Sequence, residues 1–252
     1  MASSNIAIVT GGSRGIGREA VLCLARRGVD TIFTYKSNRE EAAKVVALVE
    51  QAGARAIALP LDTGDSGAFA AFAEEVRKSL ATLGAQRFDY LVNNAGISSS
   101  ANLESITEAE MDALYDVHFK GVLFLTQKLL PLINDGGRIV NISSGLARFA
   151  MPNRIGYGSI KAAVEALTRY MAVELAPRRI AVNVVAPGAI ATDFSGGIVR
   201  DNPQVNKAVA DNTALGRVGL PQDVGPVIAG LLSDEFGWVN AQRIEVAGGI
   251  HI

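Results

Sequence analysis

The sequence predicts an α/β protein whose seven parallel strands form one doubly wound sheet, and three observations lead to this prediction. Short apolar runs alternate with longer amphipathic segments along the whole chain. Several of the runs are almost continuously apolar, as in parallel strands that are covered on both faces. A glycine-rich turn at residues 10–17 joins the first run to the first amphipathic segment. Alternation of this kind predicts right-handed crossovers between the strands.

The individual elements follow from the same patterns. Seven segments are predicted as strands: 5–10, 31–35, 56–61, 90–93, 138–142, 181–186 and 243–246. Six segments between them are predicted as helices: 16–28, 39–52, 66–84, 107–132, 153–176 and 221–233. Thr107 and Glu110 have the spacing of a capping box, and Pro221 suits the first turn of a helix. Residues 188–213 show no clear periodicity and are predicted to form an irregular lid or binding loop.

Length and composition predict one globular domain over residues 1–252. Apolar residues make up 49% of the chain and charged residues 19%, which excludes a disordered chain. The net charge is −1 and the basic residues are scattered, so no nucleic-acid partner is expected. The sequence contains neither a signal peptide nor an apolar run of about 18 residues, which predicts a cytoplasmic protein without a membrane partner. Cys23 is expected in the core, and no metal site is expected, because the two histidines are far apart in the sequence.

The turn at residues 10–17 has the sequence Thr-Gly-Gly-Ser-Arg-Gly-Ile-Gly. Gly11, Gly15 and Gly17 let the backbone turn sharply and approach a pyrophosphate closely. The helix that follows offers free N–H groups and the positive end of its dipole to an anion. The turn therefore predicts a dinucleotide site, although a structural turn without a ligand is the alternative.

The second predicted strand ends without a carboxylate that would repel a 2′-phosphate. Arg14, Lys36 and Arg39 would converge on such a phosphate, which favours NADP(H) over NAD(H); the alternative is that they are solvated surface cations. Asp62, after the third strand, is expected either to accept a hydrogen bond from the adenine amine or to cap the strand end.

Tyr157 and Lys161 are four residues apart in a predicted helix, so they share one face. A nearby cation favours the phenolate, and lowering a tyrosine pKa by roughly three units needs about 4 kcal/mol. Ser144 would bind a substrate oxygen from a second side. The set predicts proton transfer to or from an alcohol oxygen, and an ordinary exposed Tyr/Lys pair is the alternative.

In combination, these motifs resemble the short-chain dehydrogenase/reductase family in its compact single-domain form, from about residue 5 to residue 249. The resemblance is carried by the turn at 10–17, Asp62, Asn93-Asn94-Ala95-Gly96, Ser144, Tyr157-x-x-x-Lys161, and Pro187-Gly188 followed by Thr192.

The resemblance implies that Tyr157 is the general acid or base, that Ser144 polarises the carbonyl, and that Lys161 binds the nicotinamide ribose and lowers the pKa of the tyrosine. It also implies that the backbone of 93–96 packs beside the adenosine ribose and that Ile190 and Thr192 contact the nicotinamide amide; a stabilising turn for 93–96 and a loop cap for Thr192 are the alternatives. The implied cofactor-binding residues are Gly11, Ser13, Arg14, Gly15, Ile16, Gly17, Tyr35, Lys36, Ser37, Asp62, Asn93, Ala95, Gly96, Tyr157, Lys161, Pro187, Gly188, Ile190 and Thr192.

The sequence departs from the family pattern at His118, where the family usually has an asparagine. The backbone carbonyl of that asparagine is thought to hold a water that links the lysine to solvent. We expect His118 to be a fourth catalytic residue, an alternative proton relay that titrates near pH 6.5. The alternative is a spectator that fills the same space.

The leading hypothesis is an NADPH-dependent oxidoreductase that interconverts a carbonyl and an alcohol on a small molecule with an apolar body. Arg148 and Arg154 would meet an acidic group of the substrate, or only water. An apolar substrate pocket, or else ordinary core packing, is predicted for Leu146, Met151, Ile155 and Phe194.

Two alternative functions stay open. Reduction of a 3-oxoacyl group on acyl carrier protein is weakened by the lack of basic residues at 131–137. A non-catalytic NADP-binding regulator is the other alternative. The resemblance also implies a homotetramer formed through 107–132, 153–176 and the last strand. The helix 107–132 contains four leucines that fit either this interface or the core: Leu123, Leu125, Leu129 and Leu130.

Overall fold

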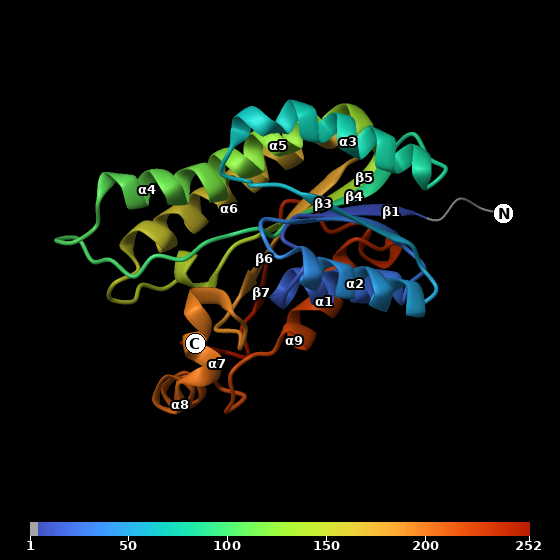
Figure 1. Cartoon of the computed structure of the whole chain (residues 1–252). Coiled ribbons are helices and arrows are strands. Elements are labelled where there is room, and N and C mark those ends of the chain that lie inside the picture. Colours follow the sequence, from blue (N-terminus) through green and yellow to red (C-terminus); the bar gives the residue numbers. More distant parts are fainter. Residues whose placement is uncertain (1–4) are drawn as a thin grey trace.

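The computed structural model describes residues 5–252, and within this part of the chain seven strands form one sheet (Figure 1). The strand order is β3-β2-β1-β4-β5-β6-β7, and every neighbouring pair is parallel. This confirms the predicted doubly wound parallel sheet. The strands are β1 (Ile6–Val9), β2 (Asp30–Tyr35), β3 (Ala56–Pro60), β4 (Phe88–Asn93), β5 (Ile133–Ile142), β6 (Ala181–Pro187) and β7 (Arg243–Val246).

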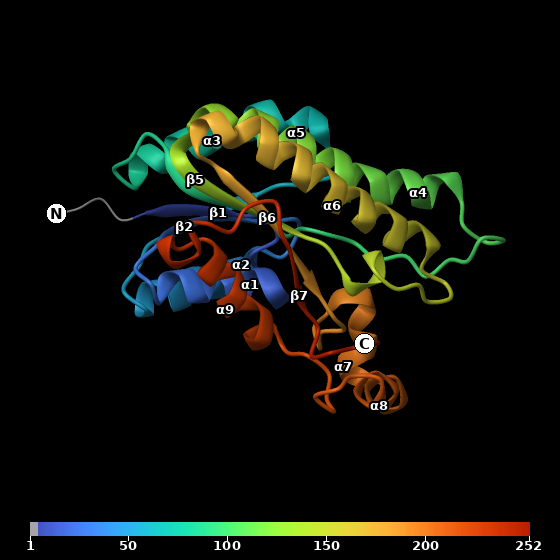
Figure 2. The ribbon, with the colours of Figure 1, turned by 180° about the vertical axis from the view of Figure 1, so that it is seen from behind.

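Helices cover both faces of the sheet, as Figures 1 and 2 show from opposite sides. One face is covered by α1 (Gly15–Ala25), α2 (Arg39–Gln51) and α9 (Pro221–Leu231). The other face is covered by α3 (Phe69–Thr82), α5 (Gly121–Leu129) and α6 (Ile155–Leu175), with α4 (Glu108–Tyr115) extending beyond it. No helix in residues 5–252 is both long enough and apolar enough to cross a membrane.

The buried side chains form two clusters, one on each face of the sheet. Phe33 and Leu24 belong to the first cluster, and Cys23 lies in it as predicted. Leu125 and Leu129, which fitted either a core or an interface, are fully buried in the second cluster. Apolar burial of this extent is the main stabilising contribution to folding.

The predicted helix 107–132 is not continuous. It is divided into α4, a π-helical turn (Asp116–Lys120) and α5, and the capping box of Thr107 and Glu110 starts α4 as predicted. A Cβ atom on Gly121 would lie 2.5 Å from the backbone oxygen of Thr63, so only glycine allows this close approach. The π-helical turn carries His118, and turns of this kind are frequent at functional sites.

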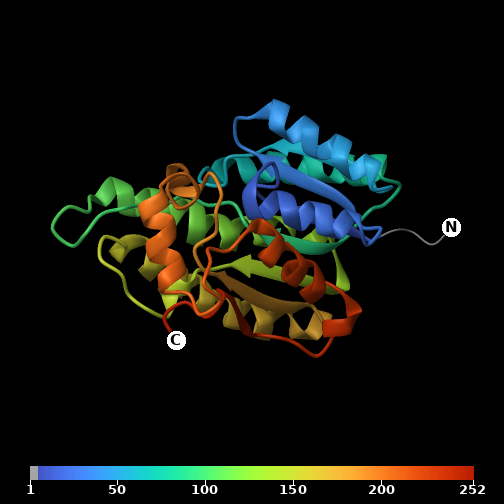
Figure 3. The same cartoon turned by 90° about the horizontal axis from the view of Figure 1, so that it is seen from below.

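The prediction of an irregular segment at residues 188–213 is wrong for much of its length. A short 3₁₀ helix (Phe194–Gly197) leads into α7 (Ile198–Asp201) and α8 (Pro203–Asp211). Asn202 caps α8 by accepting hydrogen bonds from the backbone N–H groups of Gln204 and Val205 at 3.0 and 3.1 Å. Both helices project from the body of the sheet, and the C-terminus lies beside them (Figures 1 and 3). We call residues 192–212 the lid.

Candidate active site

A cavity of about 790 Å³ opens beyond the carboxyl ends of the central strands. Its walls come from the glycine-rich turn after β1, from residues 94–98 after β4, from residues 142–146 at and beyond the end of β5, and from residues 187–190 at and beyond the end of β6. The lid closes one side. Ligands of doubly wound folds bind at this edge of the sheet, so the cavity is the candidate active site.

The glycine-rich turn is held in place by the neighbouring strands. Gly11 and Gly15 have φ angles of +66° and +57°, a left-handed conformation that favours glycine. The N–H of Gly11 donates to Thr34 Oγ1 at 3.0 Å, and Asn94 Nδ2 donates to the carbonyls of Thr10 and Gly11 at 2.8 and 3.1 Å. In the described chain no side chain caps the start of α1, so its first N–H groups can bind an anion.

Two expected cofactor residues, Gly17 and Asn93, are missing from the described lining of the cavity. Gly17 packs so closely on the Gly11 carbonyl and on Asn94 that a Cβ atom there would collide with both. Asn93 is buried, and its amide donates to Thr126 Oγ1 at 3.1 Å and to Asn141 Oδ1 at 2.8 Å. Both residues therefore stabilise the walls of the site without lining the cavity. Asn94, which the candidate list omitted, lines the cavity instead.

The three cations expected at a 2′-phosphate do not converge. Lys36 lines the cavity and forms an ion pair with Asp62, with 2.7 Å between Nζ and Oδ2. This lysine holds the pKa of Asp62 below its ordinary value, although burial opposes the effect. Arg14 is turned toward Asp193 of the lid at 4.0 Å, and Arg39 is absent from the described cavity lining. Lys36 is thus the cation best placed for a phosphate.

Tyr157 and Lys161 lie together on the first half of α6, as their spacing predicted. Lys161 Nζ is 5.6 Å from the centroid of the Tyr157 ring and donates to the backbone oxygen of Ile142 at 2.7 Å. The lysine is 4% exposed, and this burial lowers its pKa to about 7. Near neutral pH, Lys161 can therefore either hold or release a proton.

The expected lowering of the Tyr157 pKa is not found in this structure. Burial raises the pKa of the phenol well above its ordinary value, while a hydrogen bond with Ser144 and the charge of Arg154 oppose the rise. Lys161, whose own pKa burial lowers to about 7, does not offset this rise. The phenol is therefore a proton donor at neutral pH.

Ser144 ends the segment after β5 and begins a short 3₁₀ helix (Gly145–Ala147). Its Oγ accepts a hydrogen bond from the N–H of Leu146 at 3.2 Å and faces the cavity with Tyr157. The neighbouring Ser143 has a different partner, since its hydroxyl donates to Glu165 Oε1 at 2.7 Å. Ser144 is thus the serine that is available to a ligand.

His118 lies beside this pair and is 1% exposed. Its Nε2 lies 2.7 Å from the Ile97 carbonyl oxygen and 3.2 Å from the Ile97 N–H, so it donates to the carbonyl in one tautomer and accepts from the N–H in the other. The His118 ring meets the Tyr157 ring edge-on at 5.5 Å. Burial first, and then the charge of Lys161, hold the pKa of the imidazole well below its ordinary value. Titration near pH 6.5 was therefore a wrong expectation. Nδ1 has no hydrogen-bond partner among the described residues.

The far side of the cavity is mainly apolar, as predicted. Leu146, Met151 and Phe194 line it, and the Phe194 ring lies 5.9 Å from the Tyr157 ring. Ile155, the fourth residue of the predicted pocket, is exposed and absent from the described lining. Phe149 and several lid residues complete this wall: Ile198, Val199, Val205 and Val209.

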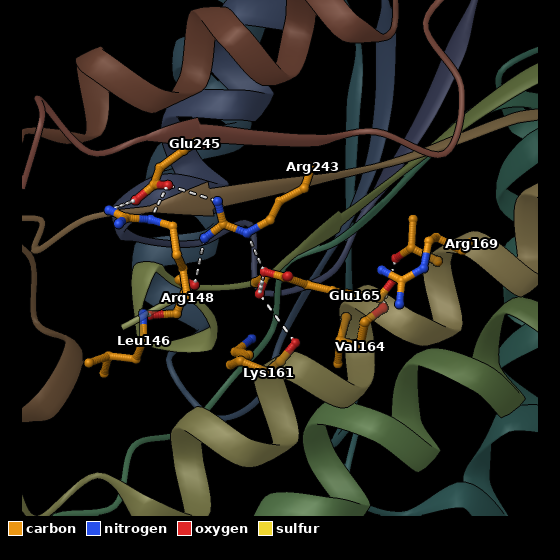
Figure 4. A network of polar contacts seen from close by, with 11 residues as sticks. Leu146, Arg148, Lys161, Val164, Glu165, Arg169, Arg243 and Glu245 are labelled. Atoms are coloured by element: carbon orange, nitrogen blue, oxygen red, sulfur yellow. Dashed lines mark hydrogen bonds and ion pairs between the residues drawn. The ribbon is translucent and has the colours of Figure 1, made fainter. Parts of the chain in front are cut away.

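The two arginines considered for an acidic substrate group are bound within the chain. Arg154 donates to the Ser99 carbonyl at 2.8 Å and to Ser100 Oγ at 2.7 Å. Arg148 makes two hydrogen bonds to Glu245, at 2.8 and 3.0 Å. Figure 4 shows that Arg148 and Glu245 belong to a series of side chains in which arginines and glutamates alternate. The remaining contacts of the series are Glu245–Arg243 at 2.8 Å and Arg243–Glu165 at 2.7 Å.

Comparisons with known proteins agree with this geometry. Residues 11–251 match a protein-family model described as enoyl-(acyl carrier protein) reductase. Versicolorin reductase 1 of Aspergillus parasiticus is 35% identical over 254 residues, which cover 97% of this chain and 95% of that protein.

Two solved structures are similarly close. The promiscuous reductase LugOII, which catalyses keto-reduction at C1 during lugdunomycin biosynthesis, is 37% identical with a TM-score of 0.93, over 99% of this chain and 98% of that one. The angucycline C-6 ketoreductase LanV with bound NADP is 33% identical with a TM-score of 0.92, over 97% and 95% of the two chains.

Proposed function

The chain belongs to the short-chain dehydrogenase/reductase family, and on that premise we propose that it is an NADPH-dependent ketoreductase. The observation that carries the proposal is one cavity with two ends. Tyr157, Ser144 and Lys161 line one end, and the glycine-rich turn lines the other. Because both ends share one space, a dinucleotide and a carbonyl compound can be bound next to each other.

The residues at the nucleotide end fit NADP(H). The turn offers the free N–H groups of α1 to the pyrophosphate, and Gly11 and Gly15 keep the backbone open to it. Lys36 and Ser37 line the cavity after β2, and LanV, which binds NADP, supports the same preference. Asp62 would release Lys36 to the 2′-phosphate. The bound nucleotide supplies the hydride for the carbonyl carbon.

The remaining chemistry is proton transfer by residues of this chain. We assign proton donation to the carbonyl oxygen to the Tyr157 phenol, and Ser144 Oγ donates a second hydrogen bond to that oxygen. Lys161, with its pKa near 7, replaces the proton that the tyrosine gives up. In the tautomer that carries its proton on Nε2, Nδ1 of His118 is free to accept a hydrogen bond, and a proton that enters at Nδ1 is matched by one that leaves from Nε2, so the imidazole relays without a net change of charge.

The substrate that fits the apolar wall is a ketone on an aromatic skeleton. Phe149 and Phe194 both line the cavity, and aromatic rings pack well edge-on or offset against such side chains. The names of versicolorin reductase 1 and of the ketoreductase LanV support this choice of reaction. Reduction of a 3-oxoacyl group on acyl carrier protein is the alternative.

Family membership also supports a single domain over residues 1–252, a cytoplasmic location and a homotetramer built through α4, α5, α6 and β7. On α6, the side chains of Tyr170 and Val173 are 70% and 73% exposed and would be covered by a partner copy. Light scattering after size-exclusion chromatography tests the tetramer, because replacing Val173 by a charged residue should then produce smaller species.

An NADPH-consumption screen tests the proposed function. The substrates are aromatic ketones, quinones, steroids and acyl thioesters, and NADH is run in parallel. We expect the fastest NADPH oxidation with an aromatic ketone. Equal or faster rates with NADH would overturn the cofactor assignment, and fastest turnover of an acyl thioester would favour the alternative substrate. Tight NADPH binding without turnover of any carbonyl would favour a non-catalytic regulator.

A further inference from the structure

The last residues of the chain form part of the wall of the candidate active site. Ile250 and His251 line the same cavity as Tyr157, together with Phe149. The rings of His251 and Phe149 meet edge-on, with 4.7 Å between their centroids and 65° between their planes. An imidazole and a phenyl ring therefore stand side by side in a wall that is otherwise mainly aliphatic.

Arg148, which belongs to the charged series in Figure 4, also binds this C-terminal segment. Arg148 donates to the carbonyl oxygens of Ile250 and His251 at 3.0 and 3.2 Å. Glu245 binds the same guanidinium through two hydrogen bonds, which fixes its plane. Arg243 continues the series and reaches the backbone oxygen of Ser144 at 3.4 Å. The position of the C-terminal segment is thereby tied to the loop that carries Ser144.

The lid also contacts this segment. The N–H of His251 donates to the Asn212 carbonyl at 3.2 Å, and Thr213 and Ile250 form an antiparallel β-bridge. Asn212 itself lines the cavity. The C-terminal segment therefore contacts both the lid, at Asn212, and Arg148, which follows Ser144 by four residues.

The backbone of His251 is strained in this arrangement. Its φ angle is +50°, in the left-handed region, which costs a residue other than glycine about 1 kcal/mol or more. Strained residues that the surrounding structure holds in place are frequent at binding sites. Within residues 5–252 the imidazole nitrogens of His251 form no recorded hydrogen bond, so they are open to a ligand.

We infer that His251 determines substrate specificity: its imidazole binds a phenol or quinone oxygen on the aromatic body of the substrate, at a distance from the reacting carbonyl. Phe149 packs against the ring that carries this oxygen. Arg148 and Glu245 are positioning residues that act through the C-terminal carbonyls. The inference rests on the proposed function only in taking the cavity as the substrate site.

The test compares 1-tetralone with its 5-, 6- and 7-hydroxy derivatives as ligands of the NADP⁺-saturated protein. Calorimetry gives Kd without turnover, and NADPH oxidation gives KM and kcat in parallel. We expect at least one hydroxytetralone to bind tighter than 1-tetralone. His251→Phe should weaken that ligand about tenfold, as for one lost hydrogen bond, and should change the Kd of 1-tetralone less than twofold.

Arg148→Met is expected to weaken the same hydroxytetralone although Arg148 does not contact it. Adding His251→Phe to this variant should weaken the hydroxytetralone little further, because both substitutions disrupt the same contact between the imidazole and the ligand. Arg178→Met is the matched control. Arg178 also binds one carboxylate, that of Asp135, and two carbonyls, those of Leu130 and Ile133, and it lies outside the described lining of the cavity.

The outcomes separate the inference from the proposed function. Equal weakening of 1-tetralone and of the hydroxytetralone by His251→Phe would overturn the inference. Such a result would mean that the substitution changes the shape of the cavity and does not remove a hydrogen bond to the hydroxyl group. Hydroxytetralones that bind no tighter than 1-tetralone, or no binding of either, would also overturn it. Selective binding without NADPH oxidation would leave the subsite standing and refute the ketoreductase.

Discussion

Because Lys161 is buried, replacing this lysine by methionine should stabilise the folded protein, although it should abolish turnover. The side chain is 4% exposed and no carboxylate contributes to its pKa, which burial lowers to about 7. An ordinary lysine has a pKa of about 10.4, and one pKa unit corresponds to about 1.4 kcal/mol. At pH 7 the buried lysine therefore destabilises the folded chain by about 4 kcal/mol.

The stability difference between the wild type and Lys161→Met depends on pH because folding lowers the pKa of the lysine. Between pH 7 and about pH 10 the lysine is protonated in the unfolded chain and largely neutral in the folded one. The unfolded chain binds more protons, so the stability of the wild type rises with pH over this range. At pH 9 the penalty has fallen to about 2 kcal/mol. The advantage of Lys161→Met should thus shrink by about 2 kcal/mol between pH 7 and pH 9.

Urea denaturation of both proteins at the two pH values measures this change. Far-UV circular dichroism is the suitable signal, because the single tryptophan, Trp238, is fully exposed. The lost hydrogen bond to the Ile142 carbonyl costs about 1–3 kcal/mol, but it lowers the advantage equally at both pH values. A stability difference that is the same at pH 7 and pH 9 would show that the pKa of Lys161 is not lowered in the folded chain.

The other predictions concern the nucleotide end and the histidine. Lys36→Ala should raise the Kd for NADPH about tenfold and leave the Kd for NADH nearly unchanged. Lys44→Ala, which removes a lysine outside the described cavity lining, should change neither value. Equal effects of Lys36→Ala on both nucleotides would contradict a contact between Lys36 and the 2′-phosphate. His118→Ala should lower turnover at every pH between about pH 5 and pH 8 without changing the shape of the pH profile, because the imidazole stays neutral over this range, and unchanged turnover would rule out the relay. Gly96→Ala would place a methyl carbon 2.6 Å from His118 Cε1, so it should destabilise the protein by about 1–3 kcal/mol. Combining it with His118→Ala, which removes the ring, should recover part of that stability in thermal denaturation. Additive effects of the two substitutions would show that the ring and the methyl group do not meet.

Much of the fold was predictable because parallel strands covered on both faces leave a plain signal. The apolar runs located all seven strands, and the main error was at β5, which begins at Ile133 instead of residue 138. Ile133 pairs with Phe88, after which the register shifts, and a pairing between distant segments leaves no local pattern. The helices α7 and α8 were missed for another reason. They are four and nine residues long, too short for the periodicity of a helix to be recognised.

The candidate site was predictable in position but only partly in chemistry. Sequence spacing alone predicted that Tyr157 and Lys161 would be neighbours. The direction of their pKa changes depends on burial, which is set by packing between distant segments, and here the expectation for Tyr157 was wrong. Asn93 is a case that sequence alone leaves open. The resemblance gives its backbone a place at the nucleotide end and says nothing of its side chain, which binds the buried Thr126 and Asn141.

Proton donation by Tyr157 to a carbonyl oxygen beside bound NADPH is tested by single-turnover oxidation of the bound NADPH at 340 nm with 1-tetralone, in the wild type and in Tyr157→Phe. We expect the rate to fall by about 10²- to 10⁴-fold in the variant, the usual contribution of general acid catalysis, and the Kd for NADPH to change far less. Oxidation of NADPH by the variant at the wild-type rate would show that the phenol is not the proton donor.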